Sequence, residues 1–516
     1  MKFHSDSSSQ RIVKNGIFTA FQFGIYILSG IFFIPFLLRQ YGSGTYGLIA
    51  LAGFLTQYVG LLSRCIGNST ARFLNIALNK KDWKQANEIF STALAANTGF
   101  ILLQLPFFAL GIWKLEWIID FPPEVALDFR ILVVCNVAVF FASLLSGVFI
   151  TPIQAANRLD ISATLDAIRL SLRLFLLFVL IKSVGAKLWL IGVVDVGLAL
   201  AYGIVVFFLR RRLAQELVFK WELITKKWVR PVLNMAGWTV IATLGGYLFV
   251  KTDVWMINRF VSKEMAGIYA ALLVWPNFLK QVSNQLASIL IPVYLIDYAK
   301  GNSERVAVLS LFSAKLIGCF VAISAGGLCI AAKPLLELWM GTGAEAYVLL
   351  FRIMILYLTY TIGESVLWPI YITIDKVHFT GMVGLCAGVI NIIASLILIR
   401  AGFGALGVAT ATAFSMTLAA GIAIPLGVCR EFNIPYRTVW WNYLCATLLL
   451  FVSLGATAAA FFVLEYSIVY ACIIFIVLLA GGVALVSHIL FSDVEKSMFR
   501  RLLQRVFKRG LKEVGG

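Results

Sequence analysis

Ionisable residues recur inside long apolar segments of this sequence, and their types and spacing suggest a definite chemistry. Asp166, Arg169 and Arg173 are spaced i, i+3 and i+7, which places them on one face of a helix. Lys280 and Lys315 stand in apolar segments without an acidic residue on their own helical face. Grouped Lys and Arg side chains are typical of sites that bind phosphate or another anion. We therefore expect a basic cavity for an anionic ligand.

The cost of such charges in a bilayer limits where they can lie. A lipid-facing charge at mid-bilayer costs roughly 3 kcal/mol. Six of them would cost on the order of 18 kcal/mol, which is more than the net stability of a typical folded protein. They must face one another, a water-filled cavity or the lipid headgroups. For the face that carries Asp166, local pairing with Arg169 is the alternative to a basic wall. The basic residues expected to line the cavity are Arg169, Arg173, Lys251, Lys280, Lys315 and Arg352.

Two acidic residues are candidates for ion coupling. Lys251 and Asp253 are spaced i, i+2 and point to different faces of a helix, so they do not simply neutralise each other. Asp253 either pairs with another helix or binds a coupling ion, and the same two alternatives hold for Glu364. The expected ion is a proton or sodium. No other cofactor is expected.

Catalytic and metal-binding motifs are absent from the sequence. It contains no Ser–His–Asp arrangement, acidic metal motif or Walker motif, and its eight cysteines form no CxxC pair. Gly42, Gly44 and Gly47 match GxGxxG, but apolar helices and not a β-strand flank them, so we interpret the run as a hairpin outside the membrane. The sequence thus predicts neither an enzyme nor a metal site.

The elements that position these residues are membrane helices. Hydrophobic residues make up 61% of the 516 residues and charged residues only 13%, whereas a soluble domain has about 25% charged residues. Apolar runs of the length needed to cross a bilayer recur throughout. The expected fold is an all-α polytopic membrane protein with about 14 transmembrane helices.

The net charge of +18 could suggest a nucleic-acid partner, but its distribution argues against one. With a cytoplasmic N-terminus, most Lys and Arg fall in cytoplasmic segments, as the positive-inside rule requires. The expected partner of these residues is the lipid bilayer. Both chain termini are predicted to be cytoplasmic.

An internal repeat divides the chain into halves. The segment Ile31–Ala50 matches Lys251–Ala270 without a gap. The identical pairs are Arg39 with Arg259, Gly47 with Gly267, and Ala50 with Ala270. The predicted organisation is two six-helix bundles at 1–209 and 231–430, a basic cytoplasmic linker at 210–230, an extra helix pair at 431–491 and a basic cytoplasmic tail at 492–516.

Two motifs carry a resemblance to a known family. The first half contains FxxPFLLRxYGxxxYG and the second half contains KTDVWMINRFVSKEMAGIYAA. With the twelve-plus-two helix plan, these resemble the polysaccharide transporter family of Wzx-type flippases. That family belongs to the MOP superfamily, with the MATE drug exporters and the MurJ lipid II flippases.

The resemblance implies a function. It implies transfer of an undecaprenyl-pyrophosphate-linked oligosaccharide from the cytoplasmic to the outer leaflet by alternating access through a central cavity. The product would be O-antigen of lipopolysaccharide, capsule or exopolysaccharide. It further implies the bacterial cytoplasmic (inner) membrane, with a polysaccharide polymerase and a chain-length regulator as partners. Since fourteen helices can enclose a cavity within one chain, a monomer is expected.

Alternative functions stay open. A MurJ-like lipid II flippase shares the basic cavity and the extra helix pair. A MATE-like, ion-coupled exporter of cationic molecules would favour an acidic or aromatic cavity, so the basic excess counts against it. A membrane polymerase or glycosyltransferase would need a large external loop or an acidic catalytic motif, and the sequence has neither.

Overall fold

A computed structural model describes residues 21–155, 158–228, 245, 248–249, 252–374 and 376–463. The regular structure of these residues is helical, without a strand. The chain divides into two compact units. The first comprises Met1–Tyr247 with Val254–Ile268, and the second comprises Leu248–Asp253 with Tyr269–Gly516. The short segment Val254–Ile268 therefore belongs to the unit that precedes it in the sequence.

The first unit consists of long helices joined by short turns. The N-cap of α4 shows how a turn is fixed, since the Asp82 side chain accepts a hydrogen bond from the Gln85 amide at 3.0 Å. Its described helices are η1 (Ser29–Phe33), α2 (Ile34–Leu51), α3 (Phe54–Asn79), α4 (Trp83–Trp113), α5 (Leu115–Ile118), η2 (Pro123–Val125), α6 (Ala126–Ala155), α7 (Leu159–Val184) and α8 (Leu188–Leu213).

The glycine-rich run 42–47 differs from the hairpin that the sequence predicted. The chain stays helical through it, and only Gly42 departs from helical geometry, with φ of 76°. A positive φ is strained for residues with a Cβ atom but not for glycine. Gly42 thus kinks α2, and the break between helices lies further on, between Leu51 and Phe54.

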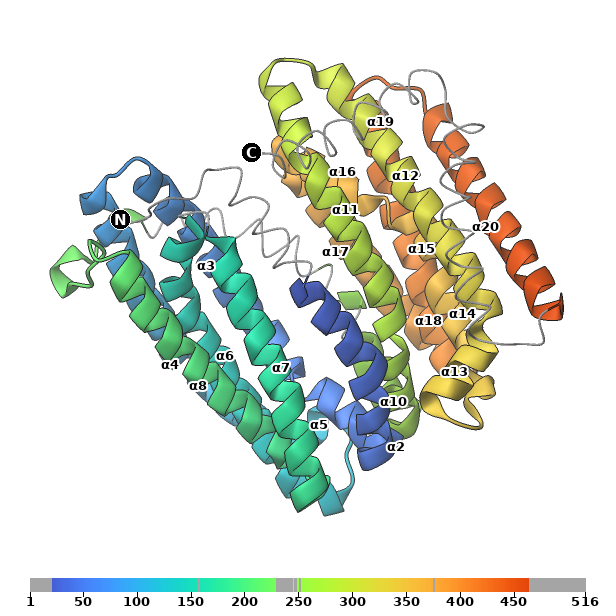
Figure 1. Ribbon diagram of the computed structural model, residues 1–516, viewed down its shortest axis with the longest axis horizontal. Coiled ribbons are helices and arrows are strands. Elements are labelled where there is room, and N and C mark those ends of the chain that lie inside the picture. Colours follow the sequence, from blue (N-terminus) through green and yellow to red (C-terminus); the bar gives the residue numbers. More distant parts are fainter. Residues whose placement is uncertain are drawn as a thin grey trace, which may run out of the picture. The chain divides into compact units, whose positions relative to one another are not determined.

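The helices of the first unit pack through small residues and a buried apolar core. The helices α6 and α8 run side by side (Figure 1). They approach closely at Gly192 of α8, where a Cβ atom would lie 2.6 Å from the Cβ of Cys135. Ile89 and Phe90 of α4, each 1% exposed, pack with Leu74 of α3 in the core.

The basic segment that follows α8 is attached to α4. Three α4 side chains bind its backbone: Asn87 bonds to the Glu216 carbonyl (3.1 Å) and the Val218 amide (2.8 Å), Ser91 accepts from the Lys220 amide (3.2 Å), and Thr92 accepts from the Thr225 amide (3.2 Å). The segment includes the turns η3 (Trp221–Leu223) and η4 (Lys226–Trp228). These bonds fix its described part against the first unit.

The second unit has more broken helices. The apolar run 346–371 is divided between three helices with turns at Tyr357 and at 362–363, and the apolar run 404–428 contains a π-helical stretch. The helices are α10 (Lys263–Leu272, which begins in the first unit), α11 (Val274–Ala299), α12 (Ser303–Ile330), α13 (Ala332–Met340), η5 (Ala344–Tyr347), α14 (Val348–Leu356), α15 (Leu358–Thr361), α16 (Glu364–Thr373), α17 (Val377–Arg400), α18 (Gly404–Met416), η6 (Thr417–Ala423), α19 (Ile424–Glu431) and α20 (Arg437–Val463).

The helix α20, which lies outside the predicted repeat, is joined to α12 along its length (Figure 1). Asn442 donates to the Leu311 carbonyl at 3.1 Å, and Ser453 donates to the Ile323 carbonyl at 2.7 Å. Gly326 of α12 permits the close approach, because a Cβ atom there would lie 2.7 Å from the Cβ of Ser453. Helix α20 is therefore an integral part of the second unit.

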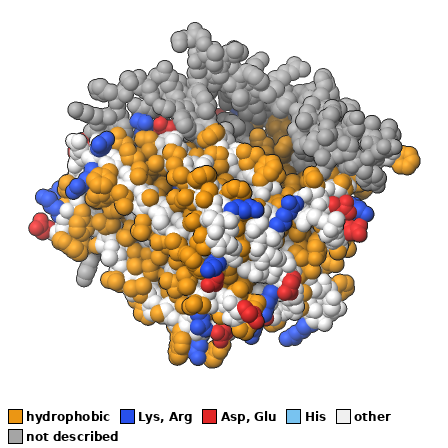
Figure 2. Space-filling model, turned by 60° about the horizontal axis from the view of Figure 1, so that its bottom comes forward, with side chains coloured by type: hydrophobic (Ala, Val, Ile, Leu, Met, Phe, Trp, Pro, Cys, Tyr) orange, Lys and Arg blue, Asp and Glu red, His pale blue; other side chains and the backbone are white. Residues whose placement is uncertain are grey.

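The molecule has the surface of a membrane protein. Within the described residues, nine helical spans are long and apolar enough to cross a bilayer. Large hydrophobic side chains such as Phe175 and Phe208 are more than half exposed. Figure 2 shows hydrophobic side chains over most of the coloured surface, with few charged ones between them. The predicted all-α polytopic membrane fold is confirmed.

Candidate functional site

The most deeply buried carboxylate described is that of Asp253, which is 1% exposed. It accepts hydrogen bonds from three side chains of the second unit: Tyr269 (3.1 Å, from α10), Asn391 (2.9 Å, from α17) and Thr412 (2.6 Å, from α18). Thr412 also lies 3.0 Å from Oδ1 of Asn391. The result is a compact cluster of oxygen atoms around one carboxylate, a donor set that suits a proton or a hard cation such as sodium.

Lys280 of α11 lies beside both this cluster and a second carboxylate. It lines the small pocket that contains Asp253, Tyr269 and Thr412. It also lines a neighbouring pocket of about 330 Å³ that contains Glu364. Its ammonium lies 5.9 Å from the centre of the Tyr357 ring, close enough for a cation–π contact. The second unit thus brings together one predicted cavity lysine and both predicted coupling residues.

The two predicted arginines of the first unit have partners on α8. Arg173 forms a two-bonded ion pair with Asp195, at 2.5 and 3.0 Å. Arg169 lies 5.2 Å from the centre of the Tyr202 ring and 3.9 Å from Asp166. The i, i+3, i+7 face of α7 is therefore directed toward α8. The pairing of Asp166 with Arg169 is present, but at a longer distance than the pair made by Arg173.

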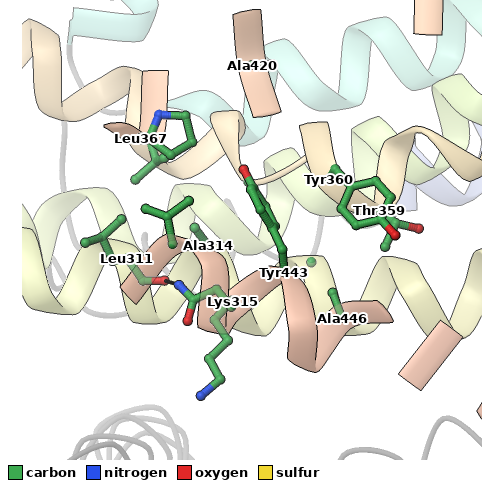
Figure 3. A pocket seen from close by; sticks show the side chains of 14 residues that line it. Leu311, Ala314, Lys315, Thr359, Tyr360, Leu367, Ala420, Tyr443 and Ala446 are labelled. Carbon is green, nitrogen blue, oxygen red and sulfur yellow. Dashed lines mark hydrogen bonds between the residues drawn. The ribbon is translucent and has the colours of Figure 1, made fainter. Parts of the chain in front are cut away.

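The remaining predicted basic residues lie apart from Lys280. Arg352 donates to the Cys329 carbonyl at 2.8 Å, which satisfies a carbonyl in the last turn of α12. Lys315 is 2% exposed and lines a small pocket beneath α20. In Figure 3 its side chain extends away from the rings of Tyr360 and Tyr443. Lys251 lies outside the described residues.

The segment Val254–Ile268 is held by the loop between α5 and α6 and by α2. Asn258 and Asp120 exchange two hydrogen bonds of 3.0 and 3.1 Å. The Trp255 indole donates to the Ile118 carbonyl at 2.6 Å, and Lys263 lies 3.4 Å from the Asp120 carboxylate. Gly267 packs on Gly47, the residue that the repeat aligns with it. These contacts fasten the segment within the first unit.

Metal-binding groups of three or more His, Cys, Asp or Glu residues are not found in the part of the chain that the structure describes. The cluster at Asp253 has a single carboxylate, and its other polar groups are neutral. It is thus unlike the sites that hold resident divalent metals.

Comparison with known proteins identifies the fold. No family model matches the chain. An uncharacterized membrane protein of Bacillus subtilis (strain 168), EpsK, is 23% identical over 413 residues, which cover 80% of this chain and 81% of EpsK. The structure is also similar to those of two kinds of transporter.

The first is the lipid II flippase MurJ in an inward closed conformation, with a TM-score of 0.67 and 15% identity over 92% of this chain and 98% of MurJ. The second is an inward-facing multidrug resistance MATE transporter of the MOP superfamily, with a TM-score of 0.60 and 12% identity over 87% and 97% of the two chains. The chain is a multi-pass membrane protein with the fold of the MOP-superfamily transporters.

Sequence reasoning found Asp253 but missed the three residues that bind it. Tyr269, Asn391 and Thr412 are neutral, so a pattern of ionisable residues inside apolar segments does not include them. A signal for Asn391 was available, since it is a lone amide in the apolar run VINIIASLILI. A polar side chain at that depth needs a partner inside the protein.

Proposed function

We propose that this protein is a flippase that moves an undecaprenyl-pyrophosphate-linked oligosaccharide from the cytoplasmic to the outer leaflet of a bacterial cytoplasmic membrane. The transfer uses alternating access and is coupled to a proton or sodium ion at Asp253. The protein is not an enzyme. The likeness of its fold to MOP-superfamily transporters supports transport, and the family motifs in the sequence support the oligosaccharide substrate.

The observation that carries the proposal is the position of Lys280 between two carboxylates. While Asp253 and Glu364 are both negative, they compete for the Lys280 ammonium. A proton or sodium ion bound at Asp253 neutralises one of these two carboxylates. Lys280 is then available to a pyrophosphate, for which charge-assisted hydrogen bonds are strong. Ion uptake and anion binding become linked through one side chain.

The other predicted groups take supporting roles in this proposal. Glu364 is the second coupling candidate. Arg173 and Arg169 are available to an anion only if they leave Asp195 and Tyr202, whereas Lys315 and Arg352 act on the packing of α12. The proposed partners are the bilayer, a polysaccharide polymerase and a chain-length regulator. The protein is proposed to act as a monomer with both termini in the cytoplasm.

The test uses a strain that lacks this chain while its glycan pathway is active. Lipid-linked oligosaccharide should accumulate on the cytoplasmic side, and surface glycan should disappear. Wild-type protein and Lys280→Arg should relieve the accumulation, whereas Lys280→Ala should not. Lys333→Ala is the matched control, because Lys333 is exposed and pairs with Glu345 at 2.7 Å outside the pockets. If the deletion strain does not accumulate lipid-linked oligosaccharide, the proposal is contradicted.

A MurJ-like lipid II flippase is the second candidate, favoured by the fold match that covers 98% of MurJ. Rescue of cells depleted of their own lipid II flippase would support it. A MATE-like exporter would instead make the deletion strain sensitive to cationic drugs without any accumulated lipid. These two results separate the alternatives from the oligosaccharide flippase.

A further inference from the structure

The largest of the described pockets lies in the first unit and is free of charge along its described lining. It has a volume of about 640 Å³ and is lined mainly by α3, α4 and α6. That volume falls in the usual range of small-molecule sites, roughly 300–1,000 Å³. None of the basic or acidic residues discussed above lines it. Its polar lining includes Gln57, Asn97, Asn136, Ser143, Thr151 and Gln154.

The hydrogen bonds of these side chains leave acceptor oxygens for a ligand. Asn97 and Asn136 donate to the carbonyls of Ala93 and Leu132, at 3.0 and 2.9 Å. Thr151 donates to the Gly147 carbonyl at 2.8 Å. Each asparagine amide uses one of its two N–H groups within its own helix, so its second N–H and its Oδ1 remain for a ligand, and the Thr151 Oγ1 remains as an acceptor. Asn97 is only 3% exposed, so its amide is buried in the cavity wall.

The chemistry of this wall selects among possible occupants. A lipid tail would leave buried amides and hydroxyls without partners, which is costly. A phosphate would find no positive charge in the described lining. A polyhydroxylated, uncharged ligand fits both requirements, because its hydroxyl groups donate to the acceptor oxygens. The Phe140 ring, which also lines the cavity, offers an apolar surface for the C–H face of a sugar ring.

We propose that this cavity binds the uncharged sugar portion of the transported lipid, an inference that rests on the proposed function. Within the first unit, Asn97, Asn136 and Thr151 serve the hydroxyl groups of this sugar portion. Sites that hydrogen-bond a hydroxyl discriminate strongly against ligands that lack it. The cavity therefore determines specificity for the glycan and not for the lipid carrier.

The test measures binding to purified full-length protein in lipid nanodiscs. One probe is undecaprenyl pyrophosphate, and the other is the lipid-linked oligosaccharide extracted from the deletion strain. Wild-type protein should bind the oligosaccharide lipid at least tenfold more tightly. The double variant Asn136→Leu, Thr151→Val should lose about tenfold of that advantage, equivalent to about 1.4 kcal/mol, and bind undecaprenyl pyrophosphate as wild type does.

Thr98→Val is the matched control. Thr98 makes the same type of bond to a carbonyl four residues earlier, that of Leu94 at 2.9 Å, but it is exposed and does not line the cavity. It should leave both affinities unchanged. Equal binding of the two lipids by wild type would overturn the sugar site alone. Equal loss of both affinities in the double variant would also overturn it. Binding of neither lipid by wild type would overturn the proposed function, and the sugar site with it.

Discussion

Gly47 and Gly267, which occupy matching positions in the two sequence repeats, pack directly on each other. A Cβ atom on Gly47 would lie 2.9 Å from the Gly267 amide nitrogen and 3.1 Å from its Cα. A Cβ atom on Gly267 would overlap the Ser43 carbonyl oxygen. Both positions require glycine because backbone meets backbone there.

Gly267→Ala is therefore expected to destabilise the protein. The added methyl group must push α10 away from α2, and overpacking of this kind typically costs about 1–3 kcal/mol. Thermal unfolding of the purified protein in detergent would measure the loss. Gly99→Ala is the control, since nothing lies within 4 Å of a Cβ atom there. An unfolding temperature of Gly267→Ala equal to that of the control would show that the packing is looser than described.

Asp253→Asn is expected to lower transport at least tenfold and to remove its dependence on the ion gradient. Asparagine keeps the shape of the side chain but loses the negative charge, and its amide group would face the donors of Asn391, Thr412 and Tyr269. Transport into proteoliposomes with imposed proton or sodium gradients would test this. Gradient dependence equal to that of wild type would exclude Asp253 as the coupling residue.

Lys280 and Lys315 of the second unit are expected to respond differently to replacement by methionine. Lys280→Met removes the group that lies beside both carboxylates and should abolish transport while the protein still folds. Lys315→Met keeps an apolar stem in the small pocket beneath α20, so it should change unfolding temperature more than transport. Parallel measurements of surface glycan and thermal stability distinguish the two. Loss of transport of similar size in both variants would favour one shared basic cavity.

The ion pair between Arg173 and Asp195 offers a separate test of the predicted basic wall. Arg173→Met leaves a partly buried carboxylate unpaired and should destabilise the first unit, by less than the roughly 3–5 kcal/mol lost when a fully buried pair is broken, because the Asp195 side chain is 24% exposed. The double variant Arg173→Met, Asp195→Leu should regain most of this stability. If Arg173 contacts the substrate, the stable double variant will still fail to transport. Full transport by the double variant would give the pair a purely structural role.

The sequence was sufficient to predict the helices and the membrane. In a bilayer only helices or closed barrels satisfy the backbone hydrogen-bonding groups, and apolar runs of about 20 residues have the length of a membrane helix. The details at Gly42 and in 417–423 could not be predicted, since a kinked or π-helical turn has the same apolar composition as a regular one. The helix breaks at Tyr357 and Gly363 could not be predicted either, because they depend on packing within the second unit.

The partners of the charged residues were harder to predict than the residues themselves. Asn391 and Thr412 lie far from Asp253 in the sequence, so only the packing of α17 and α18 brings them to it. Arg173 and Asp195 could be found as charges but not as a pair. The neutral cavity could not be predicted from the ionisable residues of the sequence, because the polar groups that line it are amides and hydroxyls.

The hydrogen bond between Tyr269 and Asp253 also has a mechanical meaning. Asp253 is the last residue of the second unit before the chain enters the first, and Tyr269 is the first residue after it returns. The Tyr269 hydroxyl donates to the Asp253 carboxylate at 3.1 Å, so this hydrogen bond joins the point where the chain leaves the second unit to the point where it returns. The carboxylate proposed to bind the coupling ion is thus also the group that holds together the two points where the chain passes between the units.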